Sequence, residues 1–256
     1  PSALLCSAAA VSAALLMQKN ENAILPAILL AIVIGAACGA FNGFLISCLK
    51  IPAMLATLGS YQLFQGISVV ISGGSSVGNI PKAYSAFGSM TVLGIPAAFL
   101  VFVAVIVATS FLMEKTVFGT RIYLVGTNAK SAMFAGVKSR VILTGAYMIS
   151  GLISGCAGLL SLARINSAKA DFGTSYTMQC ILIAVLGGVN PNGGFGTIPG
   201  IAIAVLILQM LSSYLNTFPD ISNYYRDSIW GIALIGVLII NFTIEKRKTA
   251  RQAKMN

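Results

Sequence analysis

Apolar residues in this chain fall into eight runs separated by short polar stretches. The runs cover residues 1–17, 24–48, 52–72, 93–113, 138–163, 175–187, 197–214 and 226–243. An α-helix needs about 20 apolar residues to cross the hydrocarbon core of a bilayer. The pattern therefore predicts an all-α polytopic membrane protein with about eight transmembrane helices. Because the sixth run is short, we expect a short, broken or re-entrant helix near 175–187 that continues into glycine-rich sequence.

Composition excludes the other broad classes of protein. Apolar residues make up 57% of the chain and charged residues only 9%, whereas about a quarter of the residues in soluble domains are charged. Disordered chains combine low hydrophobicity with high charge, and the mean hydropathy here is +0.90. With soluble and disordered proteins excluded, the composition indicates a membrane protein.

The runs also predict the domain organisation. We expect one transmembrane domain over residues 1–256, a long loop over 114–140 and a basic tail over 244–256. The chain begins within an apolar run. A signal peptide would need a basic residue near its start, but none precedes Lys19. We therefore expect that upstream residues are missing from this sequence.

The net charge of +10 becomes informative once it is placed on the eight crossings. With the C-terminal tail in the cytoplasm, the inner loops and tail carry eleven basic and two acidic residues, and the outer loops five basic and four acidic ones. Cytoplasmic loops of membrane proteins are enriched in Lys and Arg, so we expect this orientation. The charge then reports topology, and we expect no nucleic-acid partner, which would need a clustered basic face.

The residue inventory argues against catalysis and metal binding. The chain has no histidine, and its five cysteines, which are Cys6, Cys38, Cys48, Cys156 and Cys180, stand singly in or beside apolar runs. We expect these cysteines to pack as small apolar side chains, without disulfides or zinc. No pair of acids lies in a predicted span, which disfavours proton coupling. We expect no catalytic residue, no cofactor and no metal site.

Glycine spacing predicts close contact between helices. Gly35, Gly39 and Gly43 repeat every four residues, as do Gly151 and Gly155. Small residues at this spacing form one stripe that lets two helix backbones approach. A third glycine-rich stretch, residues 186–200, lacks the lysine and the preceding strand of a phosphate-binding loop and instead predicts a tight turn.

The loop over 114–140 contains a predicted short helix. Asn128 is suited to cap its N-terminus, the helix runs to about Ala135, and Gly136 supplies its stop. Ala129, Ala132, Met133 and Gly136 have the spacing of one apolar face. Since two turns of helix are not stable alone in water, we expect this helix to lie on a partner's groove or on the membrane interface.

The order of these motifs resembles the permease subunits of bacterial ABC importers for simple sugars, of the ribose and autoinducer-2 type. The resemblance covers essentially the whole chain and is carried by Lys50–Gly59, Ser72–Gly74, Gly126-x-Asn128-x3-Ala132-x3-Gly136-Val137, Ser150–Gly158, Ala163-Arg164, Val185–Gly188 and Gly193–Gly200. Such permeases usually begin with two further helices, which implies about ten spans in the complete protein. Ser60 stands where the family often has Thr, and Asn190–Asn192 is more polar than the usual turn.

The resemblance implies a set of partners in the bacterial inner membrane. They are membrane lipid, a second permease subunit, either a copy of this chain or a paralogue, two cytoplasmic ATP-binding subunits and a periplasmic sugar-binding protein. The short helix would then be the coupling helix seated on an ATPase, and Gly126, Asn128, Ala129, Ala132, Met133 and Gly136 would be its contact residues.

A path for a neutral sugar would need uncharged polar side chains within the spans. The candidates are Asn42, Thr57, Ser60, Gln65, Thr177 and Gln179; for each one the alternative is a hydrogen bond between helices. Two other functions stay open at this point. One is a secondary transporter or facilitator that works alone, and the other is an ABC permease for branched-chain amino acids.

Overall fold

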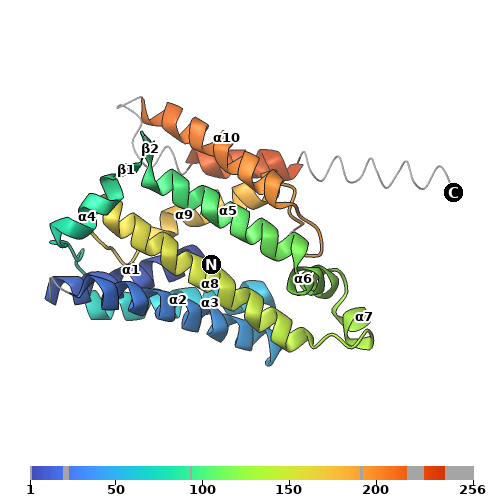
Figure 1. The fold of residues 1–256 in the computed structure, drawn as a ribbon. Coiled ribbons are helices and arrows are strands. Elements are labelled where there is room, and N and C mark those ends of the chain that lie inside the picture. Colours follow the sequence, from blue (N-terminus) through green and yellow to red (C-terminus); the bar gives the residue numbers. More distant parts are fainter. Residues whose placement is uncertain (1, 20–22, 93, 191–192, 218–227, 240–256) are drawn as a thin grey trace. The chain divides into compact units, whose positions relative to one another are not determined.

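The computed structural model describes residues 2–19, 23–92, 94–190, 193–217 and 228–239 (Figure 1). The chain divides into two compact units, residues 1–177 and 178–256, which are treated separately below. The basic tail over 244–256 lies outside the described residues.

Helices account for nearly all of the regular structure. They are α1 (Ser2–Lys19), α2 (Ile24–Ser47), α3 (Ala53–Ser72), α4 (Lys82–Ser89), α5 (Ala97–Lys115), α6 (Val117–Thr127), α7 (Ala129–Phe134), α8 (Ser139–Ile165), α9 (Phe172–Leu186) and α10 (Ile198–Asn216), with a further helix over Ser228–Ile239. Strands β1 (Thr91–Val92) and β2 (Ile95–Pro96) form an antiparallel pair.

Every predicted apolar run contains a helix, so the all-α membrane fold is confirmed. Among the described residues, α2, α3, α5, α8 and residues 198–215 of α10 are long and apolar enough to span a bilayer. Shorter apolar helices occupy the first, sixth and eighth runs. Helix α9 has 15 residues, or about 22 Å of rise, which is less than the hydrocarbon thickness of about 30 Å. The prediction of a short sixth helix therefore holds.

The central contact of the first unit is a glycine interface between α2 and α8, formed by Gly35, Gly39, Gly43, Gly151 and Gly155. A Cβ added at Gly35 would lie 2.6 Å from the carbonyl oxygen of Gly151, and one at Gly43 would lie 2.6 Å from the Cα of Thr144. The two backbones are therefore in direct contact, as the glycine spacing predicts.

Helices α1 and α4 complete the core around this pair. Buried side chains of α1, including Val11 and Met17, pack with Ala27 and Ala31 of α2 and with Leu159 and Leu162 of α8. Helix α3 packs on α1 and α2. Helix α5, by contrast, buries only Ala97 among its described side chains.

Helix α4 and the β1–β2 hairpin are elements that the hydrophobic pattern does not predict. Helix α4 has only eight residues, too few to show a clear period, and it depends on tertiary contacts. Tyr84 donates a hydrogen bond of 2.8 Å to the carbonyl of Leu159, and Gly88 rests on the backbone of Ala163. Burial raises the pKa of Tyr84 to about 12, so its hydroxyl stays protonated and able to donate.

In the second unit, glycines bring the end of α9 against the start of α10. A Cβ at Gly187 would lie 2.9 Å from the Cα of Ile201, and one at Gly200 would lie 2.5 Å from the carbonyl oxygen of Gly187. Asn190 donates from its backbone to Phe195 across the connecting turn. The predicted tight turn is confirmed for its described residues. Leu182, Leu208 and Trp230 form the buried cluster of this unit.

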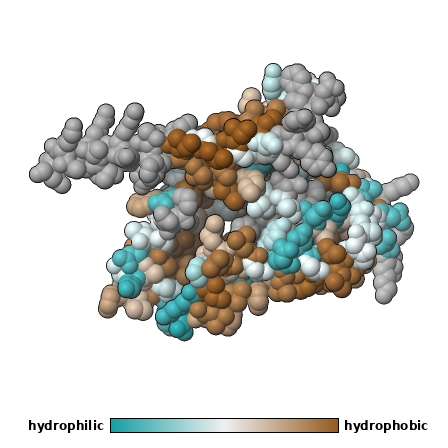
Figure 2. Space-filling model, turned by 180° about the vertical axis from the view of Figure 1, so that it is seen from behind, coloured by the Kyte–Doolittle hydropathy of each residue, from teal (hydrophilic) through white to brown (hydrophobic). Residues whose placement is uncertain are grey.

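Apolar side chains cover much of the surface of this fold, as the brown areas of Figure 2 show. Val70, Phe111 and Met210 are among the large exposed ones. Exposure on this scale is characteristic of a surface that meets lipid or another subunit. The expectation that the cysteines are packed is wrong for Cys180, which is exposed, because an apolar residue of a membrane helix can face outward.

The glycine interface gives a direct test of packing. Gly35→Ala should lower the free energy of unfolding by about 1–3 kcal/mol, because its methyl group must displace the backbone of α8. Gly66→Ala on α3 is the matched control, since nothing lies within 4 Å of a Cβ at that position, and it should be neutral or stabilising by up to about 1 kcal/mol. Unfolding of the purified protein in detergent measures both. Equal effects of the two substitutions would contradict the assigned contact.

Candidate functional site

Two surfaces of the first unit bring together the residues with functional potential. One is the pair of short helices α6 and α7, which lies between the end of α5 and the start of α8. The other is the outward face of α3. Figure 1 shows that α7 and α4 lie at opposite ends of α8.

Helix α7 is capped as the sequence predicts. The side-chain oxygen of Asn128 accepts hydrogen bonds from the backbone N–H groups of Lys130 and Ser131, at 3.0 and 3.1 Å. Gly136 follows the helix with φ of +77°, a conformation that glycine adopts readily. The predicted start and stop of this helix are confirmed.

Helix α6, which is longer, supports α7 and was not predicted. Thr116 caps α6 by accepting a hydrogen bond from the N–H of Gly119 at 3.2 Å. Val125 of α6, Ala132 of α7 and Ile142 of α8 form one buried cluster, with Phe118 and Val137 packed against it. A hydrophobic link therefore runs from α7 through α6 into the first turn of α8.

The orientation of Ala132 differs from the predicted apolar face. Ala132 is only 3% exposed and points into the cluster, whereas Met133 is 62% and Phe134 is 87% exposed. A six-residue helix that is tied to α6 and α8 at its two ends must pack one side on its own chain. The outward apolar side chains are consequently Met133 and Phe134. Phe134 was missed because it lies outside the face that the spacing predicts.

Of the six candidate path residues, three are buried within the first unit. Asn42 is 3% exposed, and its side-chain oxygen has no hydrogen-bond partner in the part of the chain that the structure describes. The hydroxyls of Thr57 and Ser60 donate to carbonyls of their own helix, at 2.7 Å to Ala53 and at 3.2 Å to Thr57. These two hydroxyls are therefore already satisfied without a ligand.

The other three candidates are partly exposed. Gln65 of α3 and Thr177 of α9 are half-buried in the first unit, and Gln179 is half-buried in the second. Thr177 donates to the carbonyl of Gly173 at 3.0 Å.

Gln65 lies on a mixed surface of α3, which we call the α3 polar face and define by Gly59, Tyr61, Gln62, Gln65 and Gly66; the exposed side chains of Leu58 and Val69 flank its two amides. Gln62 is exposed, and nothing lies within 4 Å of a Cβ built at Gly59 or Gly66. The hydroxyls of Tyr61 and Thr174 lie 3.2 Å apart and share a hydrogen bond, which joins this face to the start of α9. Gln62 and Tyr61 were missed because the sequence does not say which side of α3 is covered.

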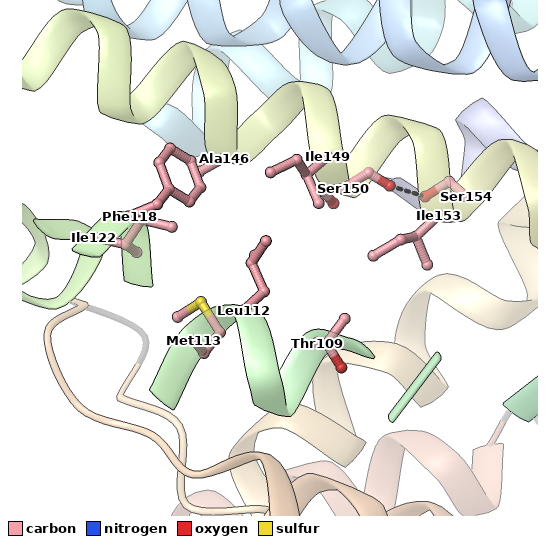
Figure 3. Close-up of a pocket in the computed structure, with 10 residues that line it drawn as sticks. All are labelled: Thr109, Leu112, Met113, Phe118, Ile122, Ala146, Ile149, Ser150, Ile153 and Ser154. Carbon is pink, nitrogen blue, oxygen red and sulfur yellow. Dashed lines mark hydrogen bonds between the residues drawn. The ribbon is translucent and has the colours of Figure 1, made fainter. Parts of the chain in front are cut away.

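A hollow of about 360 Å³ lies between α5, α6 and α8 (Figure 3). Leu112 and Met113 on one side face Ala146 and Ile149 on the other, and Phe118 closes one end. The hydroxyls of Ser154 and Thr109 donate to carbonyls of their own helices, and the remaining lining is apolar except for Ser150. Its lining suits an apolar occupant.

The fold and these surfaces define a multi-pass helical membrane protein that carries a capped helix pair between two of its spans. Residues 2–238 match the family of permease components of the branched-chain amino acid transport system. The chain belongs to this family of importer permeases, and the family predicted from its motifs is confirmed.

Named relatives support this assignment. The chain is 32% identical over 219 residues to the autoinducer 2 import system permease protein LsrD of Escherichia coli K12, and equally to LsrD of Escherichia coli O157:H7 and of Shigella flexneri. The matched region covers 83% of this chain and 66% of each relative. The chain thus spans just under two thirds of the length of these relatives. No solved structure matches the chain.

Proposed function

We propose that this chain is the membrane-spanning permease of an ATP-driven importer in the bacterial inner membrane, and that its cargo is a neutral, sugar-like solute such as autoinducer 2. The observation that carries the proposal is the capped helix α7, which holds Phe134 and Met133 outward while Ala132 ties it to α6 and α8. A helix held in this way can be displaced by a partner and can transmit that displacement to the spanning helix α8. Family membership and the LsrD relatives support the same function.

The energy source in this proposal is a pair of ATP-binding subunits in the cytoplasm. Solute arrives from a periplasmic binding protein, and a second permease, either a copy of this chain or a paralogue, completes the path. The basic residues of the 114–140 loop and of the tail support the proposed placement of both on the cytoplasmic side. This chain contributes the path and the coupling contact.

The polar lining favours an uncharged cargo. The α3 polar face offers the amides of Gln62 and Gln65 and the hydroxyl of Tyr61, and it contains no ionised group. Amides and hydroxyls both donate and accept hydrogen bonds, which suits the hydroxyls of a sugar. An amino acid would bring a separated ammonium and carboxylate, for which charged partners give stronger contacts.

Uptake measurements with an inactive ATPase test the energy source. When the phosphate-binding lysine of the partner ATPase is replaced, uptake of labelled autoinducer 2 or ribose into cells should fall to background, because the permease has no other drive. Membrane levels of the permease serve as the control. Persistent uptake would establish a facilitator instead, and uptake of labelled leucine in place of the sugars would establish an amino acid importer.

The outward side chains of α7 predict where coupling is lost. Phe134→Asp should lower uptake at least tenfold, because removal of an aromatic anchor from an interface costs about 2 kcal/mol or more. Phe134→Leu keeps an apolar contact and should retain most of the activity. The assay combines uptake with co-purification of the ATPase, and membrane content of both variants is compared.

Substitution of Phe134 distinguishes a contact role of α7 from a structural role. A charge at Ala132 would break the buried cluster, and any side chain at Gly136 would strain its positive φ, so loss of transport there would not identify a contact. Unchanged uptake and unchanged ATPase binding in Phe134→Asp would contradict the coupling role of α7.

The α3 polar face predicts which side chains the solute meets. Replacing both Gln62 and Gln65 by Leu should lower uptake about three- to tenfold, as expected for the loss of one or two hydrogen bonds. Thr57→Val is the matched control on the same helix: Thr57 is buried and bonded to its own backbone, so uptake should stay within twofold. The opposite ranking of the two variants would place the path on the buried side of α3.

A further inference from the structure

Helices α5, α6 and α7 follow one another with a single residue at each junction. Thr116 is both the C-terminal cap of α5 and the N-terminal cap of α6, and Asn128 has the same position between α6 and α7. The connection from α7 to α8, by contrast, covers residues 135–138 and contains Gly136. The route from α7 to a spanning helix that has the fewest non-helical residues therefore leads back to α5.

The hydroxyl of Thr116 is bonded to both of the helices that meet there. It donates to the carbonyl of Leu112, in the last turn of α5, at 2.5 Å, and it accepts from the N–H of Gly119, in the first turn of α6, at 3.2 Å. A threonine hydroxyl has one donor and two acceptor positions, so both bonds can form together. Because helix ends leave carbonyls and N–H groups without partners inside the helix, one side chain here stabilises two helix ends.

Gly119 brings the two backbones into contact at the same junction. It is buried, and a Cβ added to it would lie 2.5 Å from the Cα of Met113 and 2.6 Å from the carbonyl oxygen of Leu112. A larger residue would have to displace the last turn of α5. We call Leu112, Met113, Thr116 and Gly119 the α5–α6 corner, which is held by backbone contact as well as by two hydrogen bonds.

The contacts of α6 with α8 are of a different kind. The ring of Phe118 lies against α8, 3.2 Å from a Cβ built at Gly145, and Val125 packs with Ile142 in the buried cluster. Both contacts are made by side chains, and packed helices can slide over one another by small distances at such contacts. Helix α6 is therefore joined more firmly to α5 than to α8.

We propose that Thr116 and Gly119 are positioning residues of the transport cycle, which make α6 a rigid extension of α5 so that a displacement of α7 also moves α5. This inference rests on the proposed importer function. Helix α5 is long and apolar enough to span a bilayer, and its residues Ala97–Lys115 include neither Gly nor Pro, at which sharp kinks usually form. A movement at the end that carries α6 would thus be transmitted along the whole span.

Distances between spin labels test the rigidity of the corner. In the full chain, with the five native cysteines replaced by alanine, Val107→Cys on α5 and Leu124→Cys on α6 supply exposed labelling sites. One narrow distance distribution is expected, and it should be the same in the purified permease and in its complex with the ATP-bound ATPase. Thr116→Val should broaden the distribution at least twofold, and Thr116→Ser, which keeps the hydroxyl, should restore it. A broad distribution in the parent protein, or a distance that changes with ATP, would overturn the proposal.

Uptake of labelled autoinducer 2, measured per permease in the membrane, tests the transmission to α5. Thr116→Val and Gly119→Ala should each lower uptake at least fivefold, while the ATPase still co-purifies, because the outward side chains of α7 are unchanged. Thr116→Ser should stay within twofold of the parent protein. Thr109→Val on α5 is the matched control, since the Thr109 hydroxyl donates to carbonyls of its own helix, and it should also stay within twofold.

The variants separate a positioning role from a structural one. Equal losses in Thr116→Val and Thr109→Val, or unchanged uptake in Gly119→Ala, would overturn the positioning role. A loss in Thr116→Ser as large as in Thr116→Val would overturn it too, because the hydroxyl would then not be the group that matters. Absence of uptake in the parent protein would contradict the importer function itself, whereas the label distances would still decide whether the corner is rigid.

Discussion

The direct backbone contact of α2 with α8 is the constraint on which the first unit depends. Within a membrane, lipid is as apolar as a leucine side chain, so helices gain little by hiding apolar surface from it. Helix association instead depends on close van der Waals contact, which glycine at every fourth position permits. The hydroxyls of Ser47 and Thr144, 3.0 Å apart, extend the contact by a hydrogen bond. Helix α8 is thereby fixed, and both of its ends become attachment points.

The two ends of α8 are used differently. At one end, the Tyr84 hydroxyl and the backbone of Gly88 hold α4 on the backbone of α8. At the other end, the link from α7 to α8 passes through side chains of Val125, Ala132 and Ile142. In the proposed importer, a push on Phe134 would reach α8 through this cluster. Because α8 is locked to α2 by glycine contacts, the two helices would respond as one body.

Hydropathy and local motifs predicted the features that depend on residue type and spacing within one segment. The spans, the cap at Asn128, the stop at Gly136 and the glycine contacts all follow from residue type and spacing. Helix α4, the hairpin and α6 could not be found in this way, since each is short and is held by contacts with distant residues.

Prediction of the candidate site was limited in the same way, because it also depends on contacts with distant residues. Polarity identified Asn42, Thr57 and Gln65 equally, yet only the tertiary packing shows that the first two are buried. Likewise, spacing placed Ala132 and Met133 on one face, whereas the contact with Val125 and Ile142 separates them. A sequence shows which side chains are polar or small, but their neighbours decide whether they are available.

The spans of the first unit also differ in what they can face. Helix α3 exposes Gln62 and leaves Gln65 half-exposed, and amides set in hydrocarbon would lose hydrogen bonds that they make in water. These two amides favour water or another protein as the neighbour of this side of α3, although Leu58 and Val69 are exposed beside them. Helix α5 exposes Phe99, Val103, Val107 and Phe111, which lose nothing in lipid. Within the first unit, α5 thus offers a surface suited to the bilayer, whereas α3 carries amides that favour a polar neighbour.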